Sequence, residues 1–154
     1  MLIHALLVVI VAAAPAPAKK LKFVVHELST QGGIPADNGA TLSLQVCQEL
    51  ASLGDYDVIC TDELRAMAEM QQRKLDLNAC NSDECLKMIG ELSQADRLVT
   101  GSVGKLDKST VLSLNLVDAA SGKVLARASD KVNGGIDSVL DRIKPTLKKL
   151  LSVK

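Results

Sequence analysis

The chain has almost no aromatic residues: among its 154 residues tryptophan is absent, and Phe23 and Tyr56 are the single phenylalanine and the single tyrosine. Proteins that bind single-stranded nucleic acid stack the bases on aromatic side chains, and this chain lacks them. An excess of positive charge is missing too, because 18 Lys and Arg residues balance 18 Asp and Glu residues. A surface that follows nucleic-acid phosphates needs clustered cations. The composition therefore argues against a nucleic-acid partner.

The sequence also lacks the motifs of common catalytic sites. Ser-Gly-Lys at 121–123 has no upstream glycine of a P-loop. Gly-Ser-Val-Gly at 101–104 lacks the GxSxG spacing of a nucleophile elbow. His26 could pair in principle with Ser29 or Ser102, but nothing in the sequence brings them together, and a lone histidine in an apolar strand is far more often structural. We therefore expect no enzyme, no catalytic residue and no cofactor.

Metal ligands are equally sparse. The acidic residues Asp55, Asp57, Asp62 and Glu63 cluster around one expected strand, where they are more simply loop charge and helix-start charge than a calcium loop or a carboxylate pair. The closest cysteines are spaced CxxxxC rather than CxxC, and one histidine, His26, follows the amino-terminal apolar segment. We expect no metal site.

The amino terminus has the pattern of a secretory signal peptide. Residues 2–14 form an apolar run too short to span a bilayer comfortably, and Ala-Pro-Ala at 16–18 fits a cleavage site. We predict a signal peptide at 1–18, cleaved after Ala18, and one domain at 19–154. The segment before the apolar run has no Lys or Arg, so an uncleaved membrane anchor stays an alternative. No cysteine lies near the cleavage site, so we expect a periplasmic or secreted protein without a lipid anchor.

Four cysteines, Cys47, Cys60, Cys80 and Cys85, lie after the signal peptide. An even number in an exported chain indicates disulfides, and four cysteines allow three pairings. Cys80 and Cys85 flank a turn-like Asn-Ser-Asp-Glu and form the pair that we predict. Cys47 and Cys60 are as compatible with buried free thiols as with a second disulfide.

The pattern of apolar residues predicts strands and helices in the order β-α-β-α-α-β-β-β-α. The expected strands are 21–28, 56–60, 97–106, 110–117 and 123–131, and the expected helices are 42–53, 61–70, 82–92 and 136–151, with a loop at 29–39. The strand at 110–117 alternates leucines with Ser113 and Asn115, which indicates one buried and one wet face. We therefore predict an α/β protein with a single mixed sheet of about five strands, a C-terminal antiparallel meander, and helices packed on the sheet.

The last helix has a strong apolar stripe that Pro145 interrupts. Proline lacks a backbone donor, so we expect a kink or a split near Ile143. A membrane-surface role is one interpretation of this basic, amphipathic end. Packing on the sheet is the better one, because that face of the sheet otherwise lacks cover.

The stretch QADRLVTGSVGKLDKSTVLSLNLVDAASGKVLARAS resembles a signature of one cell-envelope group. Its parts are Ala-Asp, an aliphatic strand with Gly-Ser, a hairpin, Leu-Val-Asp and Ser-Gly-Lys-Val. The group contains the curli-secretion component CsgG, the amino-terminal domain of TolB, and lipoprotein activators of penicillin-binding proteins. The resemblance implies a periplasmic accessory domain that docks on a larger assembly. The turn at 106–110 is too short for the membrane hairpins of a pore, so pore formation is not implied.

These observations together predict a non-catalytic domain that binds protein partners in a secretion, outer-membrane or wall-synthesis complex. One alternative is a small-ligand sensor or carrier with a cleft at the carboxyl ends of the strands, near Gly32, Gly33 and Gly101. Another is a structural protein that forms homo-oligomers through an exposed edge at 110–131.

Overall fold

The computed structural model describes residues 14–71, 76–77 and 80–152 of the chain. Most of the predicted signal peptide, residues 1–13, lies outside the described part. The elements are β1 (Leu21–Val25), β2 (Ser29–Gln31), α1 (Ala36–Ser52), β3 (Tyr56–Ile59), α2 (Thr61–Met70), α3 (Asp83–Ser93), β4 (Arg97–Leu106), β5 (Ser109–Asp118), β6 (Val124–Asn133) and α4 (Ile136–Leu151).

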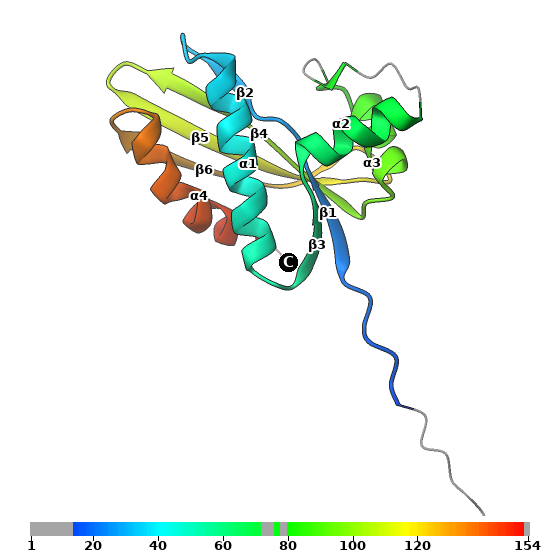
Figure 1. Cartoon of the computed structure of the whole chain (residues 1–154). Helices are drawn as coiled ribbons and strands as arrows, with labels where there is room; N and C mark the ends of the chain where they lie inside the picture. Colours follow the sequence, from blue (N-terminus) through cyan, green and yellow to red (C-terminus); the bar gives the residue numbers. More distant parts are fainter. Residues whose placement is uncertain (1–13, 72–75, 78–79, 153–154) are drawn as a thin grey trace, which may run out of the picture.

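The strands form one mixed sheet in the order β3-β1-β4-β5-β6 (Figure 1). β3, β1 and the start of β4 run parallel, whereas β4, β5 and β6 form the antiparallel meander. The predicted fold class and meander are therefore confirmed, and the predicted order of elements holds apart from one added strand.

One segment differs from the prediction, because the expected first strand ends early and a sixth strand follows it. β1 stops at Val25, and residues 29–31, expected in a loop, form β2 against the far half of β4. Between them, the backbone N–H of Leu28 donates to Ser43 Oγ of α1 at 2.7 Å. β4 has ten residues and β1 only five, so β2 supplies backbone partners along the edge of β4 that β1 leaves open.

Successive residues of the strands enter two different cores. Phe23 and Val25 pack with buried residues of α1 and α4 on one face of the sheet, which we call the front. Val24 packs with α2 and α3 on the opposite face, the back. The front core reaches from β1 to β6, whereas the back core is confined to β1, β3, the start of β4 and the end of β5.

α4 is one helix that includes Pro145, so of the two expected outcomes, a kink or a split, the split is wrong. Proline removes one helical hydrogen bond, and the carbonyl left without that donor belongs to Asp141, an exposed residue that water can reach. The buried residues Val139, Ile143 and Leu147 lie before and after Pro145 and hold the helix on the sheet. Packing therefore outweighs the local preference to break. No described helix is long and apolar enough to cross a membrane.

Candidate functional site

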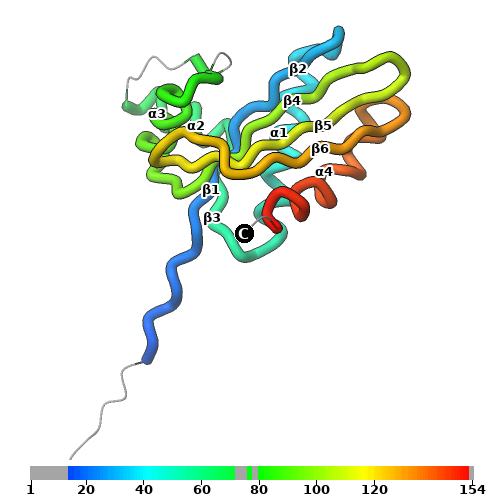
Figure 2. Tube along the Cα trace, turned by 180° about the vertical axis from the view of Figure 1, so that it is seen from behind, coloured from blue at the N-terminus to red at the C-terminus, as the bar shows by residue number. Residues whose placement is uncertain are grey.

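On the back of the sheet, most of the meander is covered by no described helix. Figure 2 shows this side, with α2 and α3 at one end and no described helix across the rest of β4, β5 and β6. The side chains here alternate with those of the front core. We call them the open face: Ser29, Gln31, Thr100, Ser102, Gly104, Val111, Ser113, Asn115, Arg127, Ser129 and Lys131.

The strand register arranges the open face in rows. Ser29 lies opposite Ser102, Ser102 opposite Ser113, and Ser113 opposite Ser129, so four serines cross four strands. Neighbouring strands are about 4.8 Å apart, which makes the row roughly 14 Å long. Thr100, Asn115 and Arg127 form a second row. The sequence predicted a wet face for the last two strands, but the rows depend on a register that the sequence does not state.

The polar side chains of the open face keep free hydrogen-bonding capacity. The structure gives no hydrogen bond within the described part of the chain to the side chains of Thr100, Ser102, Ser113, Asn115 or Ser129. The first four are half-buried and Ser129 is exposed. A partner that lay on this face would therefore find donors and acceptors that need not first break protein contacts.

β6 separates its charges between the two sides of the sheet. Arg127 and Lys131 are exposed on the open face and form no ion pair with described residues. Asp130 faces the front instead, where its side chain is 10% exposed. There it accepts hydrogen bonds from Lys149 Nζ and Thr146 Oγ1, both at 2.7 Å. These contacts hold the pKa of Asp130 below its ordinary value.

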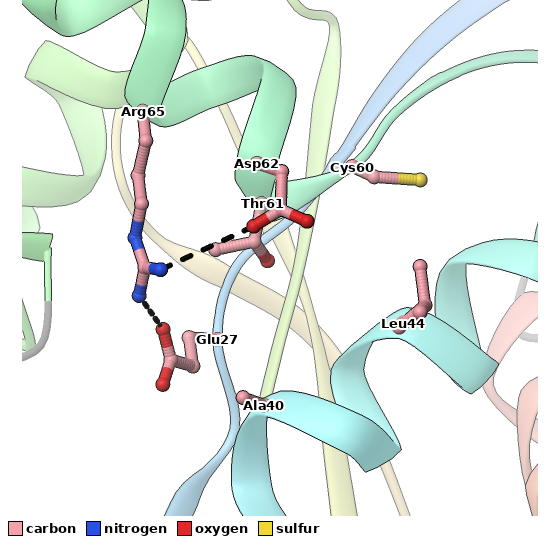
Figure 3. Close-up of a pocket in the computed structure, with 7 residues that line it drawn as sticks. All are labelled: Glu27, Ala40, Leu44, Cys60, Thr61, Asp62 and Arg65. Carbon is pink, nitrogen blue, oxygen red and sulfur yellow. Dashed lines mark hydrogen bonds and ion pairs between the residues drawn. The ribbon is translucent and has the colours of Figure 1, made fainter. Parts of the chain in front are cut away.

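A second candidate is a small hollow at the carboxyl ends of β1 and β3 (Figure 3). Its volume is about 30 Å³. Arg65 of α2 reaches across to Glu27, which follows β1, and pairs with its carboxylate. The lining residues do not include Gly32, Gly33 or Gly101, where the sequence placed such a cleft; they are Glu27, Ala40, Leu44, Cys60, Thr61, Asp62 and Arg65.

Gly101, one of the glycines at which the sequence placed a cleft, serves close packing instead. A Cβ on Gly101 would lie 2.2 Å from the carbonyl oxygen of Ser113, so β4 and β5 approach as closely as they do only without a side chain there.

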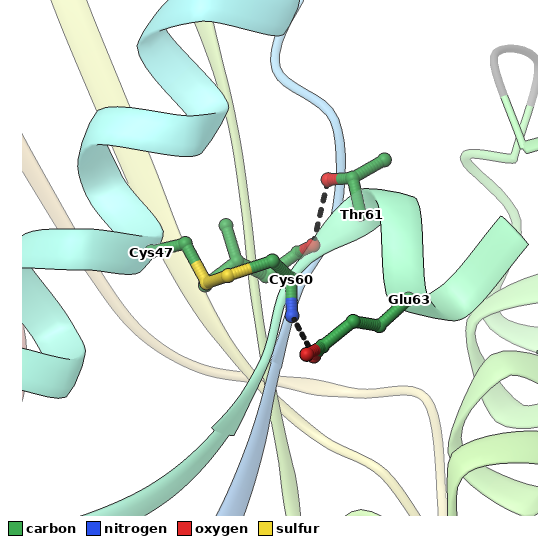
Figure 4. The surroundings of a disulfide bond; sticks show 5 residues. Cys47, Cys60, Thr61 and Glu63 are labelled. Carbon is green, nitrogen blue, oxygen red and sulfur yellow. Dashed lines mark hydrogen bonds between the residues drawn. A yellow bond between two sulfur atoms is a disulfide. The ribbon is translucent and has the colours of Figure 1, made fainter. Parts of the chain in front are cut away.

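Two disulfides hold the amino-terminal ends of α2 and α3, and one of them reaches α2 from α1 on the front. Cys80 is bonded to Cys85, and Cys47 of α1 is bonded to Cys60, the residue before α2 (Figure 4). In each pair one cysteine is buried, Cys47 or Cys80, and the other is partly exposed. The second disulfide, which the sequence left open, follows from the fold: α1 brings Cys47 over the end of β3. Both disulfides have a structural role, because each fixes the start of a helix to another segment of the chain.

Within the described part of the chain, no hydrogen bond joins His26 to Ser29 or Ser102, the residues considered for catalysis. Ser29 and Ser102 are neighbours on the open face. His26 is buried, and its Nδ1 lies 3.0 Å from the carbonyl oxygen of Glu27. Burial lowers the pKa of His26, against the opposing effects of the Leu77 and Glu27 backbone.

Of the acidic residues considered as ligands, Asp62 and Glu63 lie at the start of α2, whereas Asp55 precedes β3 and Asp57 lies within it. Glu63 Oε2 accepts a hydrogen bond from the backbone N–H of Cys60 at 3.0 Å, and Asp62 lies beside it in the first turn of α2. The described residues contain no group of three His, Cys, Asp or Glu side chains that could hold a metal ion.

The residues of the family-like signature hold the turns of the sheet together. Asp96 Oδ2 accepts from the backbone N–H of Lys22 at 2.8 Å, and Arg97 pairs with Asp118 at 2.8 Å. Ser121 Oγ donates to Asp118 at 2.9 Å, and the Ser121 hydrogen bonds are the main reason that the pKa of Asp118 is lowered. These contacts give the signature residues a structural role in the sheet.

Three solved structures show where this fold occurs. The C-terminal domain of LpoB from Escherichia coli is 13% identical to the chain, with a TM-score of 0.59 over 77% of this chain and 87% of that domain. PelC from Paraburkholderia phytofirmans, solved as a dodecamer, is 19% identical, with a TM-score of 0.58 over 90% of this chain and 94% of PelC. TolB from Acinetobacter baumannii is 14% identical, with a TM-score of 0.53 over 90% of this chain and 30% of TolB.

These likenesses confirm the predicted resemblance at the level of the fold, a mixed α/β module. No curated protein matches the sequence significantly. The family whose sequence pattern does match is described as a protein of unknown function (DUF2380), and the match extends over residues 21–150. The chain therefore belongs to that family.

Proposed function

We propose that this protein is a secreted, periplasmic accessory domain that binds a protein partner in a cell-envelope assembly and catalyses no reaction. The observation that carries the proposal is the open face, a polar surface on which Thr100, Ser102, Ser113, Asn115 and Ser129 keep their hydrogen-bonding capacity. Interfaces between proteins that associate reversibly are about as polar as ordinary protein surface, so a polar face suits such a partner.

Two features support a location outside the cytoplasm. The predicted signal peptide at 1–18 directs the chain out of the cytoplasm, and disulfides such as Cys47–Cys60 persist in oxidising compartments. We propose that the signal peptide is cleaved after Ala18 and that no lipid is attached. The shared fold with LpoB, PelC and TolB is consistent with a place in the envelope.

The hollow beside Arg65 gives little support to the alternative of a small-ligand carrier, whereas wider hollows of about 310 Å³ and 300 Å³ lie beside Leu28 and on the open face beside Ser113. A pocket for a small ligand usually has a volume of about 300–1,000 Å³. The hollow beside Arg65 has about 30 Å³, which is room for roughly two water molecules. Its polar groups are also engaged, since Arg65 pairs with Glu27.

Affinity recovery from envelope extracts tests the proposal. The full chain with an affinity tag is compared with Ser113→Tyr, which fills the centre of the open face, and with Lys148→Tyr, a matched change on the exposed side of α4. We expect the wild type and Lys148→Tyr to recover the same envelope protein, and Ser113→Tyr to lose it. Failure of all three to recover a protein, together with a ligand-induced rise in the Tm, would support the carrier instead.

A further inference from the structure

We propose that the open face binds an extended, acidic segment of a partner protein, which lies across β4, β5 and β6 with its carboxylates near Arg127 and Lys131. This inference rests on the proposed function and specifies the chemistry of the partner. It also specifies that the segment lies on the face of the sheet rather than along its edge.

Charge is the first argument. Arg127 and Lys131 are the charged members of the open face, and the defined set contains no carboxylate. The acidic residue between them, Asp130, is turned to the front and neutralised there by Lys149. Both open-face cations are exposed and form no ion pair among the described residues. A segment with carboxylates complements this pattern, whereas a basic segment is repelled by it.

Size is the second argument. Four strands at about 4.8 Å and five residues at about 3.3 Å give the open face an area of roughly 300 Å². A stable interface between globular proteins buries about 800 Å² on each partner. The face is thus too small for a globular interface by itself, but a chain of about six extended residues spans it.

Hydrogen bonding is the third argument. An extended segment carries a backbone donor and an acceptor at nearly every residue. Three serines of the row, Ser102, Ser113 and Ser129, and Asn115 provide hydroxyl and amide groups with no partner in the described part of the chain. Ser29, the fourth serine, donates to the carbonyl oxygen of Gly101 at 3.4 Å. Hydroxyls both donate and accept, so the row can satisfy a backbone of either direction.

The edge of the sheet is the less suitable place for the segment. β6 is the terminal strand on the side of the meander, and terminal strands can pair with another chain. However, the pairing of β6 with β5 is irregular where it meets Leu116 and Val117 of β5. β6 also carries the charged Arg127 and Lys131 and turns the charged Asp130 inward. Each of these features discourages strand addition. The same features argue against self-association through the exposed edge.

Photo-cross-linking tests the inference in cells that produce the protein naturally. A photoreactive phenylalanine replaces Leu106, an exposed residue at the rim of the open face, in the full chain. The cross-link to a partner is then measured with the open face intact, with Arg127→Glu plus Lys131→Glu, and with Lys87→Glu plus Lys148→Glu as a matched control on exposed helix positions. A milder pair, Arg127→Gln plus Lys131→Gln, and the Tm of each variant check that loss of the cross-link is not loss of the fold.

We expect the charge-reversed open face to lower the cross-link yield by about tenfold or more, since like charges across an interface repel. The neutral pair should lower the yield less, and the helix control should leave it unchanged. Mass spectrometry should place the cross-link in a partner segment rich in Asp and Glu. An unchanged yield in the charge-reversed variant would overturn the acidic-segment inference while the docking function stands. Absence of any cross-linked protein, even from the intact face, would contradict the docking function itself.

Discussion

The two sides of the sheet are completed in different ways. The front is covered by α1 and α4, and one apolar core extends beneath them from β1 to β6 (Figure 1). The back is covered only at one end, by the shorter helices α2 and α3, whose amino-terminal ends are held by the two disulfides. From this difference we expect the front to provide most of the stability and the covered end of the back to depend on its disulfides, and we propose that the remainder of the back binds the partner.

Neighbouring residues of β5 offer the sharpest test of this difference. Leu114 is fully buried in the front core, whereas Ser113 lies on the open face. We expect Leu114→Ala to lower the free energy of unfolding by about 2–5 kcal/mol, because the large side chain leaves a cavity. Ser113→Ala should change it by less than about 0.5 kcal/mol. Urea denaturation of both variants measures the two values, and equal losses would contradict the assignment of the two sides.

The two disulfides should differ in how much each contributes to the free energy of unfolding. Cys47 and Cys60 are 13 residues apart, and Cys80 and Cys85 are five apart. Loop-closure entropy then predicts a loss of about 3 kcal/mol for Cys47→Ala plus Cys60→Ala, and about 2 kcal/mol for Cys80→Ala plus Cys85→Ala. Denaturant unfolding under non-reducing conditions measures both.

Peptide mapping without reduction comes first in that experiment. If all four thiols are free in native material, the disulfides and the support they give to export fail together. If the Cys80–Cys85 variant is the less stable of the two, the loop-entropy account of the back layer is wrong.

On the back of the sheet, His26 should cause a smaller change in the free energy of unfolding, at mildly acidic pH. Burial lowers the pKa of His26, so the unfolded chain binds a proton more readily than the folded chain. The free energy of unfolding should therefore decrease as the pH falls below about 6.5, until the lower pKa of the folded state is reached. His26→Gln should flatten the curve of stability against pH in this range. Denaturation at a series of pH values between 5 and 8, taken as roughly the histidine range, is the measurement. A curve for His26→Gln parallel to that of the wild type would contradict the prediction.

On the front, Asp130 should change the free energy of unfolding by less than His26 does, and at lower pH. Lys149 and Thr146 lower the pKa of Asp130 below its ordinary value of 3.8. The carboxylate therefore stabilises the fold fully above about pH 3.8, and this stabilisation is lost as the pH falls through the lower pKa of the folded state. The difference in stability between the wild type and Asp130→Asn should thus be largest near neutral pH and shrink in acid. A difference that does not vary with pH would mean that Asp130 acts through packing rather than through its charge.

Much of the fold was predictable from the sequence because local patterns determine it. The alternation of Leu112 and Leu114 with Ser113 identified the inner side of β5, and the apolar stripe identified α4 despite Pro145. The split at Pro145 was wrong because tertiary packing outweighs one lost hydrogen bond. β2 was missed because its three residues, Ser29 to Gln31, have no strand pattern of their own and pair only because β4 is long.

The candidate site was less predictable than the fold. The wet side of the last strands could be read from their alternation, but the serine row joins four strands that are far apart in sequence. Its register is set by the packing of the front core and by the turns held by Asp118 and Gly122, where a Cβ on Gly122 would lie 2.2 Å from the carbonyl oxygen of Asp83. The cleft was expected beside the glycines, whereas the hollow forms where α1 and α2 meet the ends of β1 and β3, which depends on tertiary structure.

Amine labelling of the native lysines tests the central claim most directly, since it needs no substitution. Lys131 lies on the open face, and Lys148 and Lys87 lie on exposed positions of α4 and α3. The extent of acetylation at each lysine is compared between the purified protein and the same protein in intact envelopes. An occupied open face predicts that Lys131 is labelled several-fold less in envelopes, while Lys148 and Lys87 are labelled equally in both. Equal labelling of Lys131 in the two settings would contradict it.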